Sequence, residues 1–145
     1  LEIYQNPVNT FVAQFIGSPP MNLLEVNYEK SDVLKHSHFK IVIGQPQKEI
    51  LKDYNYEKII MGIRPESFIL GEASEFSIPV IVNVVEVLGH ETILTVNLVG
   101  NSEETLQVKL FTERQINLGE KLNLNIDLNR VNFFDSYQGK NLKFS

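Results

Sequence analysis

The histidines and one pair of adjacent glutamates are the side chains of this sequence best suited to do chemistry by themselves. His36 and His38 would lie on the same side of a strand and His90 stands alone, so no pair has the helical spacing of metal ligands. Residues 103–104, both glutamate, follow the polar turn at residues 100–102, where solvent exposure does not favour acid–base catalysis. We therefore expect solvated side chains rather than a metal site or an acid–base pair.

The sequence also lacks the local motifs of the common nucleotide-binding and hydrolytic sites. It contains no phosphate-binding loop ending in Lys-Ser or Lys-Thr, no dinucleotide-binding fingerprint and no Gly-x-Ser-x-Gly elbow. It has no cysteine, which excludes disulfides and thiolate metal sites. We expect a chain that is not an enzyme and that binds no cofactor itself.

Residues 62–66, Gly-Ile-Arg-Pro-Glu, are the first of several segments that stand out. Pro65 restricts the preceding Arg64 to extended conformations and removes one amide donor, so the arginine is held in one direction where a strand ends. Arg64 and Glu66 either pair with each other or a neighbour, or contact a partner.

Residues 84–92, Val-Val-Glu-Val-Leu-Gly-His-Glu-Thr, are the second. Glu86 lies in a strongly apolar strand, so it faces solvent or forms a pair between subunits or domains. Gly89 permits a tight turn, after which Glu91 begins the returning strand of a hairpin.

Residues 132–135, Asn-Phe-Phe-Asp, are the third. Adjacent aromatic side chains point to opposite sides of a strand. One of them is expected to fill the core, which makes Phe134 a candidate for a docking surface, next to Asp135.

Residues 6–22 form the fourth segment and predict a short helix with a sharp end. Asn6 and Pro7 suit a helix start, and the apolar residues Phe11, Val12, Phe15 and Ile16 would share one face that covers a core. Gly17 and the prolines at 19–20 then end the helix.

The bulk properties of the chain are those of one folded domain. Its 145 residues are 43% hydrophobic and 21% charged, and the formal net charge of −5 argues against binding nucleic acid as the main role. No apolar run approaches the ~20 residues that cross a bilayer.

Beyond residue 22 the pattern is that of short strands. Alternating apolar residues predict about eight or nine strands and no crossover helices, which indicates an antiparallel, mainly β fold, favoured as a partly closed barrel. Residues 44–57 are expected to form a loop with an irregular strand, and Pro79 suggests an edge or a bulge. Residues 71–74 are the candidate joint between two halves.

Taken in order, these segments resemble the C-terminal regulatory domain of ATPases of the MalK and UgpC group of sugar ABC importers. The resemblance rests on Tyr4 and Pro7 through Pro19, Met21-Asn22, residues 62–66, Val85-Glu86-x-Leu88-Gly89-x-Glu91, and Phe134-Asp135. Residues 30–57 and 101–120 resemble it least. It implies an assembly of the oligonucleotide-binding (OB) type, called TOBE, in residues 23–145, with residues 1–22 as helix and linker from a preceding ATPase domain.

The resemblance also implies a regulatory and dimerisation role without catalysis. A second copy, the ATPase domain, membrane permease subunits and in some members a phosphotransferase enzyme IIA would be the partners, on the cytoplasmic face of the membrane. ATP and Mg²⁺ would belong to the ATPase domain. The expected contact residues are Arg64, Glu66, Glu86, Gly89, Glu91, Phe134 and Asp135.

Two other functions stay open from sequence. Related barrels in molybdate systems bind oxyanions between subunits, although the acidic balance and scattered lysines argue against this. Oligonucleotide-binding modules stack bases on aromatic residues in a basic groove, and the five tyrosines leave some room for such a role.

Overall fold

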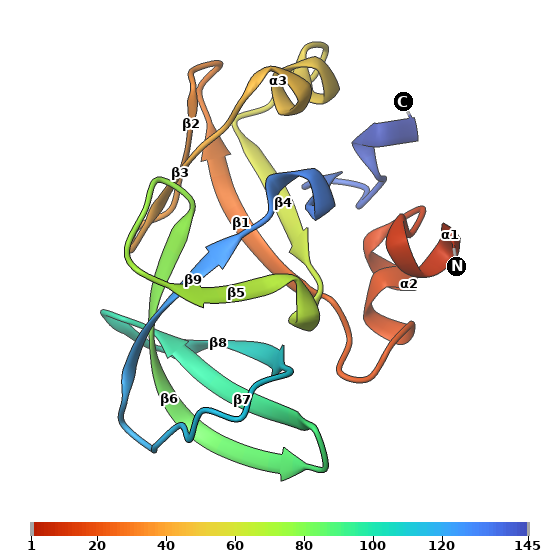
Figure 1. Cartoon of the computed structure of the whole chain (residues 1–145). Coiled ribbons are helices and arrows are strands. Elements are labelled where there is room, and N and C mark those ends of the chain that lie inside the picture. Colours follow the sequence, from red (N-terminus) through yellow and green to blue (C-terminus); the bar gives the residue numbers. More distant parts are fainter. Residues whose placement is uncertain (1, 145) are drawn as a thin grey trace.

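Most of the chain is β-strand, as the alternation of apolar residues predicted. The computed structural model describes residues 2–144, whose strands form two five-stranded sheets with antiparallel pairing throughout (Figure 1). In order across the first sheet lie β10 (Asn132–Asp135), β4 (Lys58–Ile63), β1 (Asn22–Tyr28), β2 (Val33–Lys35) and β3 (Lys40–Val42). Across the second lie β5 (Phe68–Gly71), β9 (Lys121–Ile126), β6 (Ser77–Leu88), β7 (Glu91–Leu98) and β8 (Asn101–Leu110).

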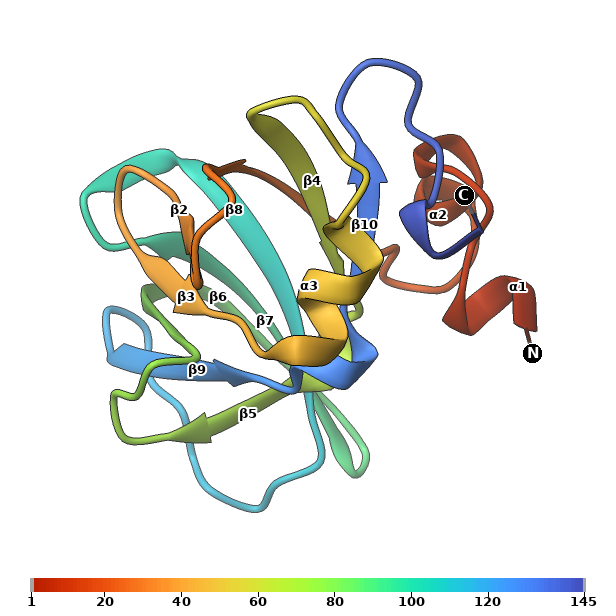
Figure 2. The same cartoon turned by 90° about the horizontal axis from the view of Figure 1, so that it is seen from above.

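The helices are short and lie outside the sheets. They are α1 (Glu2–Gln5), α2 (Thr10–Phe15), α3 (Gln45–Leu51) and the 3₁₀ turns η1 (Pro65–Ser67), η2 (Leu128–Arg130) and η3 (Leu142–Phe144). Figures 1 and 2 both show α1 and α2 together on one side of the β body, with the C-terminal turn beside them. No helix among residues 2–144 is both long and apolar enough to cross a membrane.

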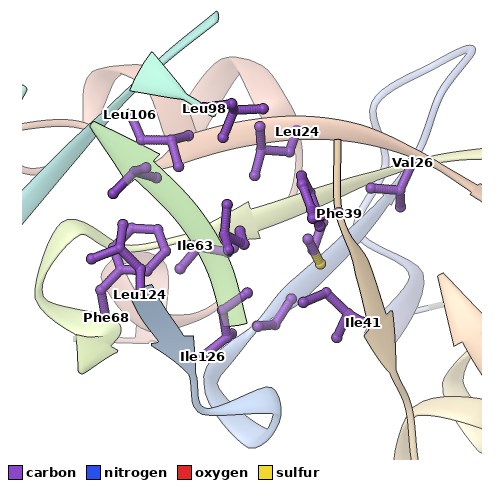
Figure 3. Close-up of a cluster of buried hydrophobic side chains, with 14 of the residues drawn as sticks. Leu24, Val26, Phe39, Ile41, Ile63, Phe68, Leu98, Leu106, Leu124 and Ile126 are labelled. Atoms are coloured by element: carbon purple, nitrogen blue, oxygen red, sulfur yellow. The ribbon is translucent and has the colours of Figure 1, made fainter. Parts of the chain in front are cut away.

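One hydrophobic core joins the two sheets. Inward residues alternate with exposed ones along each strand, as in the buried-exposed pattern of β1, because successive side chains of a strand point to opposite faces. Figure 3 shows that Leu24 and Ile63 of the first sheet pack with Leu98 and Leu124 of the second.

The division into two halves at residues 71–74 is wrong. β5 ends at Gly71 but pairs with β9, and β10 returns from the far end of the sequence to pair with β4. The second sheet therefore begins at Phe68 and consists of the consecutive strands β5–β9, whereas the first sheet needs β10 from beyond them, and one core joins both sheets.

The N-terminal helix differs from the prediction in its start and in its buried face. Asn9, not Asn6, caps α2: its side chain accepts a hydrogen bond from the N–H of Val12 at 2.8 Å. Ala13 faces the β body, whereas Phe11 and Phe15 are 68% and 70% exposed and contact each other with ring centroids 4.8 Å apart. The small alanine permits the close approach that either phenylalanine would prevent.

Residues 44–57 contain a helix that the sequence pattern did not predict. Gly44 is the N-cap of α3, and its N–H donates to the side chain of Gln47 at 2.9 Å; Pro46 lies in the first turn. Gln47 and Leu51, one turn apart, are its buried residues. A seven-residue helix with two buried positions is too short to produce a recognisable helical periodicity in the sequence.

Pro79 lies in a central strand rather than at an edge. β6 runs between β9 and β7, and Pro79 pairs with Asn123 of β9. Its carbonyl accepts from Val99, while the β6–β7 ladder begins only at Val80, so the missing N–H interrupts no ladder bond. The bulge of this strand lies further on, between Val82 and Val84.

We predict that Gly62→Ala lowers the free energy of unfolding by about 1–3 kcal/mol through overpacking. A Cβ at this position would come within 2.5 Å of Met21 Sδ and 2.7 Å of Phe134 Cε2, which is closer than packed atoms tolerate. Urea unfolding measures the change. Gly44→Ala is the control, because its nearest neighbour would be an ordinary 3.5 Å away; equal losses in both variants would contradict the packing argument.

Candidate functional site

The sequence-predicted contact residues fall into two groups in space. Arg64, Glu66, Phe134 and Asp135 surround the N-terminal segment, which we define as residues 2–21. Glu86, Gly89 and Glu91 lie in the outer part of the β6–β7 hairpin, the hairpin arm, which we define as residues 84–95. The structure thus brings the first group together around the N-terminal segment, and Glu91 of the second group is linked to that segment through Lys109, which pairs with Glu91 and donates to the carbonyl of Ser18.

Arg64 is the centre of the first group. It is only 3% exposed, at the end of β4, and its guanidinium donates from Nε and Nη2 to the carbonyl of Tyr4 at 3.1 and 2.6 Å. Nη1 donates to the carbonyl of Ile16 at 2.7 Å. These carbonyls lie in the last turn of α1 and at the C-cap of α2, where helices leave acceptors unpaired and carry partial negative charge. One side chain therefore fixes the ends of both helices.

Tyr4 connects Arg64 to Glu66. Its ring lies under the guanidinium, 4.2 Å from centroid to Cζ, and its hydroxyl donates to the Glu66 carboxylate. Burial, followed by this hydrogen bond, raises the pKa of Tyr4 to about 12, and burial lowers the pKa of Arg64. Arg64 and Glu66 therefore both contact Tyr4 of their own chain. Tyr4 is part of the sequence motif, but the sequence alone predicted no role for it.

Phe134 contributes an apolar contact to the same segment. The expectation of one exposed aromatic is wrong, because Phe133 and Phe134 are both 0% exposed. Phe133 joins the main core, whereas Phe134 packs with Ala13 and Met21 in a separate cluster. The other face of the sheet is covered by the N-terminal segment, so the second aromatic docks within the chain.

Two buried asparagines complete the attachment, and sequence reasoning missed both. Asn132 Nδ2 donates to the carbonyl of Gln5 at 2.9 Å, and Asn141 Nδ2 donates to the carbonyl of Pro7 at 2.8 Å. The two amides also bond to each other at 3.0 Å. A backbone bond from Thr10 to the carbonyl of Gly139, at 2.9 Å, adds to them. No local pattern marks these asparagines, because their partners lie near the other end of the sequence.

Asp135 holds the turn that presents Gly139 to the segment. Its carboxylate accepts backbone N–H bonds from Tyr137, Gln138 and Lys140 at 2.9, 2.6 and 3.1 Å. Partial burial opposes ionisation, but the backbone donors outweigh it and lower the pKa of Asp135. This aspartate therefore has a structural role in the turn.

The β6 part of the hairpin arm, residues 84–88, is at least partly exposed on both faces, whereas Thr92 and Leu94 of its β7 part are buried. Gly89 has a φ of 64° at the first position of the two-residue loop, as a tight hairpin turn requires. Glu86 faces solvent, and Glu91 forms an ion pair with Lys109 at 3.6 Å. Val87, beside them, is 71% exposed. The arm thus shows an apolar surface with two carboxylates.

A groove runs between the arm and residues 111–116, with a volume of about 810 Å³. Phe111, Arg114 and Ile116 line one side, and Val85 and Val87 line the other. The lining combines apolar side chains with the charged side chains of Glu113 and Arg114.

The histidines are not all solvated, in contrast to the sequence-based expectation. His36 Nε2 contacts both carboxylate oxygens of Glu104 at 3.1 Å, and its ring stacks on Phe39. This contact ties β8, which includes Glu104, to the end of β2. Within residues 2–144 no three His, Asp or Glu side chains gather in a way that could hold a metal ion.

We predict that Asp135→Asn destabilises the protein near neutral pH by about 1.5–3 kcal/mol, the range for hydrogen bonds to a charged group. The folded-state pKa is lowered, so the contribution is complete above the unfolded pKa of about 3.9 and disappears as pH falls through the folded value. Urea unfolding of both proteins across the acid range should show the curves converging at low pH. A constant difference at every pH would contradict this role of the carboxylate.

Comparisons with known proteins agree with this architecture. The MalK OB fold domain family matches residues 17–68 and the TOBE domain family matches residues 61–134. The trehalose/maltose import ATP-binding protein MalK of Thermococcus litoralis is 31% identical over 147 residues, covering 96% of this chain and 39% of that protein. The sn-glycerol-3-phosphate import ATP-binding protein UgpC of Escherichia coli K12 is 32% identical over 144 residues, covering 97% and 38%.

A solved structure shares the fold. The cytoplasmic molybdate-binding protein ModG, with molybdate bound, superposes with a TM-score of 0.57 at 11% identity over 77% of this chain and 94% of that one. The chain spans less than two fifths of the length of the two curated relatives described above, 39% and 38%. Because the TOBE domain family matches just over half of its residues, the chain belongs to that family, in the form with a MalK-type OB fold domain that is found in the ATP-binding subunits of sugar ABC importers.

Proposed function

We propose that this chain is the regulatory and dimerisation domain of the ATP-binding subunit of a bacterial carbohydrate ABC importer. In this role it performs no catalysis and transmits contacts with other subunits and regulators to an ATPase domain. The likeness to MalK and UgpC supports the class of subunit. The way in which the N-terminal segment is attached to the β body supports the proposal that the chain transmits these contacts to the ATPase domain.

The observation that carries the proposal is the attachment of both helix ends to one buried arginine. If the ATPase domain precedes residues 1–22, as the resemblance implies, its movements reach the β body through this segment. Arg64, Asn132 and Asn141 bond the segment to β4, β10 and the chain beyond β10. A segment held at several separate points moves with the β body rather than as a hinge. The two domains would therefore turn together.

The hairpin arm is the surface that we assign to a second copy of the chain. It exposes Val84, Val87 and Leu88 at 44%, 71% and 53%, and the groove beside it also exposes Phe111. Exposed apolar side chains gathered in one place are typical of protein interfaces. Glu86 would then meet a cation of the partner at the rim, such as Arg114, which lines the groove.

A regulator such as an enzyme IIA protein would bind elsewhere on the same β body. Residues 30–57, which resemble the family least, include α3 and carry exposed charges such as Lys52 and Asp53. The subunit would work on the cytoplasmic face of the membrane, beside the permease. A regulator acts in such an arrangement by binding one state of the dimer more tightly than the other.

ATP and Mg²⁺ would be bound by the ATPase domain of the parent subunit. The residues of this chain do not fit them: the sequence has no phosphate-binding loop, and the described part gathers no carboxylate group suited to a cation. Hydrolysis of ATP by the purified chain would refute the non-catalytic role.

We predict that Arg64→Met loosens the N-terminal segment and lowers the free energy of unfolding by about 2–3 kcal/mol, because two helix-end carbonyls lose charged donors. Hydrogen exchange should rise at the backbone amides of residues 10–16 while β7 keeps its protection. Arg114→Met is the matched control, since that arginine is half exposed and pairs with Glu120 rather than with the N-terminal segment. Unchanged exchange in residues 10–16 would contradict the role of Arg64 as an anchor.

We predict that a hybrid UgpC, with this chain in place of its matching 144 residues, supports uptake of sn-glycerol 3-phosphate in cells that lack UgpC. Adding Arg64→Met should reduce this uptake severalfold at equal protein level, and adding Lys58→Met, at an exposed lysine outside both groups of contact residues, should not. UgpC without those residues serves as the baseline. A hybrid that accumulates normally but transports no better than this baseline would refute the proposed function.

A further inference from the structure

The part of β6 that lies in the hairpin arm has one uncovered edge. Residues 77–81 pair with β9 on that side, and Val82 still donates to the carbonyl of Glu120 and accepts from the N–H of Gly119. Beyond the bulge that follows Val82, the strand pairs with β7 alone, and within residues 2–144 no strand pairs with residues 84–88 on the opposite side. In Figure 1 this end of β6 lies at the lower margin of the molecule.

The register of the ladders shows which backbone groups of this edge point outward. The N–H and C=O of Gln107 bond to the side chain of Asn22, at 2.8 and 2.9 Å, so they face away from β7. Because hydrogen-bonded and other pairs alternate in an antiparallel ladder, Thr95, opposite Gln107, directs its own groups toward β6. The same alternation along β6 directs the N–H and C=O of Val85 and Val87 away from β7. The two-residue hairpin loop gives the same assignment, because the residues that flank such a loop form a hydrogen-bonded pair.

The edge at residues 84–88 lacks most of the features by which proteins keep exposed strands from pairing. It contains neither proline nor lysine, and its one charged residue is Glu86. Its apolar side chains are well exposed, with Val87 at 71% and Leu88 at 53%. The bulge lies before this stretch and leaves the edge itself regular. The edge is therefore suited to receive another strand.

A second copy of the same edge would satisfy these groups. Two identical edges related by a two-fold axis run antiparallel, so that each outward N–H meets an outward C=O of the other. Val87 would then pack against a β-branched side chain, a pairing that strands favour. The groove that we assign to a second copy also adjoins this edge, since Val85 and Val87 line it.

We propose that two copies of this chain join through β6, with residues 84–88 of one paired antiparallel with the same residues of the other. A register with Glu86 opposite Glu86 of the second copy would place two like charges side by side. Placing Val87 opposite Val87 of the second copy avoids this and sets Glu86 against Leu88. The outward groups of Val87 then exchange both hydrogen bonds, and one sheet continues across the two copies.

The pairing makes the subunit contact of the proposed function specific, and its role in transport rests on that function. The association itself belongs to the isolated chain and is measured without the transporter. Backbone hydrogen bonds require particular distances and angles, so a shared sheet would fix the orientation of one β body against the other. It would do so without depending on a charge pair at Glu86.

Crosslinking tests the register directly, because the sequence contains no cysteine. Val87→Cys would place two thiols at the two-fold axis, on residues whose Cα atoms lie about 5.5 Å apart, within the range of a disulfide. We expect mild oxidation to give a covalent dimer of this variant. Tyr137→Cys is the control, because Tyr137 is 73% exposed and lies outside the arm. No dimer from Val87→Cys, or equal yields from both variants, overturns the proposal.

Sedimentation equilibrium of the 145-residue chain measures the strength of the association. Val87→Pro removes an outward N–H and no bond to β7, which is the place where an edge strand accepts proline. It should weaken dimerisation about tenfold or more, because each copy loses a donor, while Val87→Ala keeps the donor and should weaken it less. An unchanged far-ultraviolet circular dichroism spectrum shows that the fold is kept.

Two results overturn the pairing and leave the proposed function standing if the hybrid UgpC still supports uptake. One is a chain that stays monomeric at about 1 mM. The other is a dimer that Val87→Pro does not weaken, which would assign the association to another face. Loss of uptake by the hybrid together with a dimer that crosslinks at Val87→Cys would refute the function and keep the pairing.

Discussion

The buried guanidinium of Arg64 is the contact on which the placement of the N-terminal segment depends. Strand β4 ends at Ile63, and Pro65 keeps the next residue extended, so the arginine leaves the sheet in one direction. There it meets the ends of α1 and α2, whose carbonyls would otherwise be unpaired beneath it. Two helices too short to be stable alone are thereby held by a residue of the β body.

Polar contacts determine the orientation of α2 within this segment. Within α2 only Ala13 is buried, while Phe11 and Phe15 point outward. Hydrophobic contact is non-directional, and one alanine buries little surface. Hydrogen bonds from Arg64 and Asn141 require particular distances and angles, so they specify one orientation. The exposed phenylalanine pair remains available for a further domain or subunit.

The sequence predicted what depends on near neighbours along the chain. Strand alternation, the turn at Gly89 and the restraint of Pro65 on Arg64 are local, and the structure contains each of them. The pairing of β10 with β4, the amide contacts of Asn132 and the docking of Phe134 join residues that are far apart in the sequence. No periodicity reports such pairings, which is why the expected boundary at residues 71–74 and the exposed aromatic were wrong.

The β body connects the hairpin arm to the anchor without a flexible link. The arm continues the inner part of β6, which pairs with β9; β9 pairs with β5, and β5 follows η1 and Arg64 directly. A displacement of the arm therefore reaches the N-terminal segment through hydrogen-bonded ladders. Such continuity transmits position, but allostery also needs an element with two states. The structure contains one packing of these ladders and of their shared core. In the proposed dimer, the two states would therefore come from how the copies of the domain meet, and each domain would supply a fixed distance and direction between its arm and its N-terminal segment.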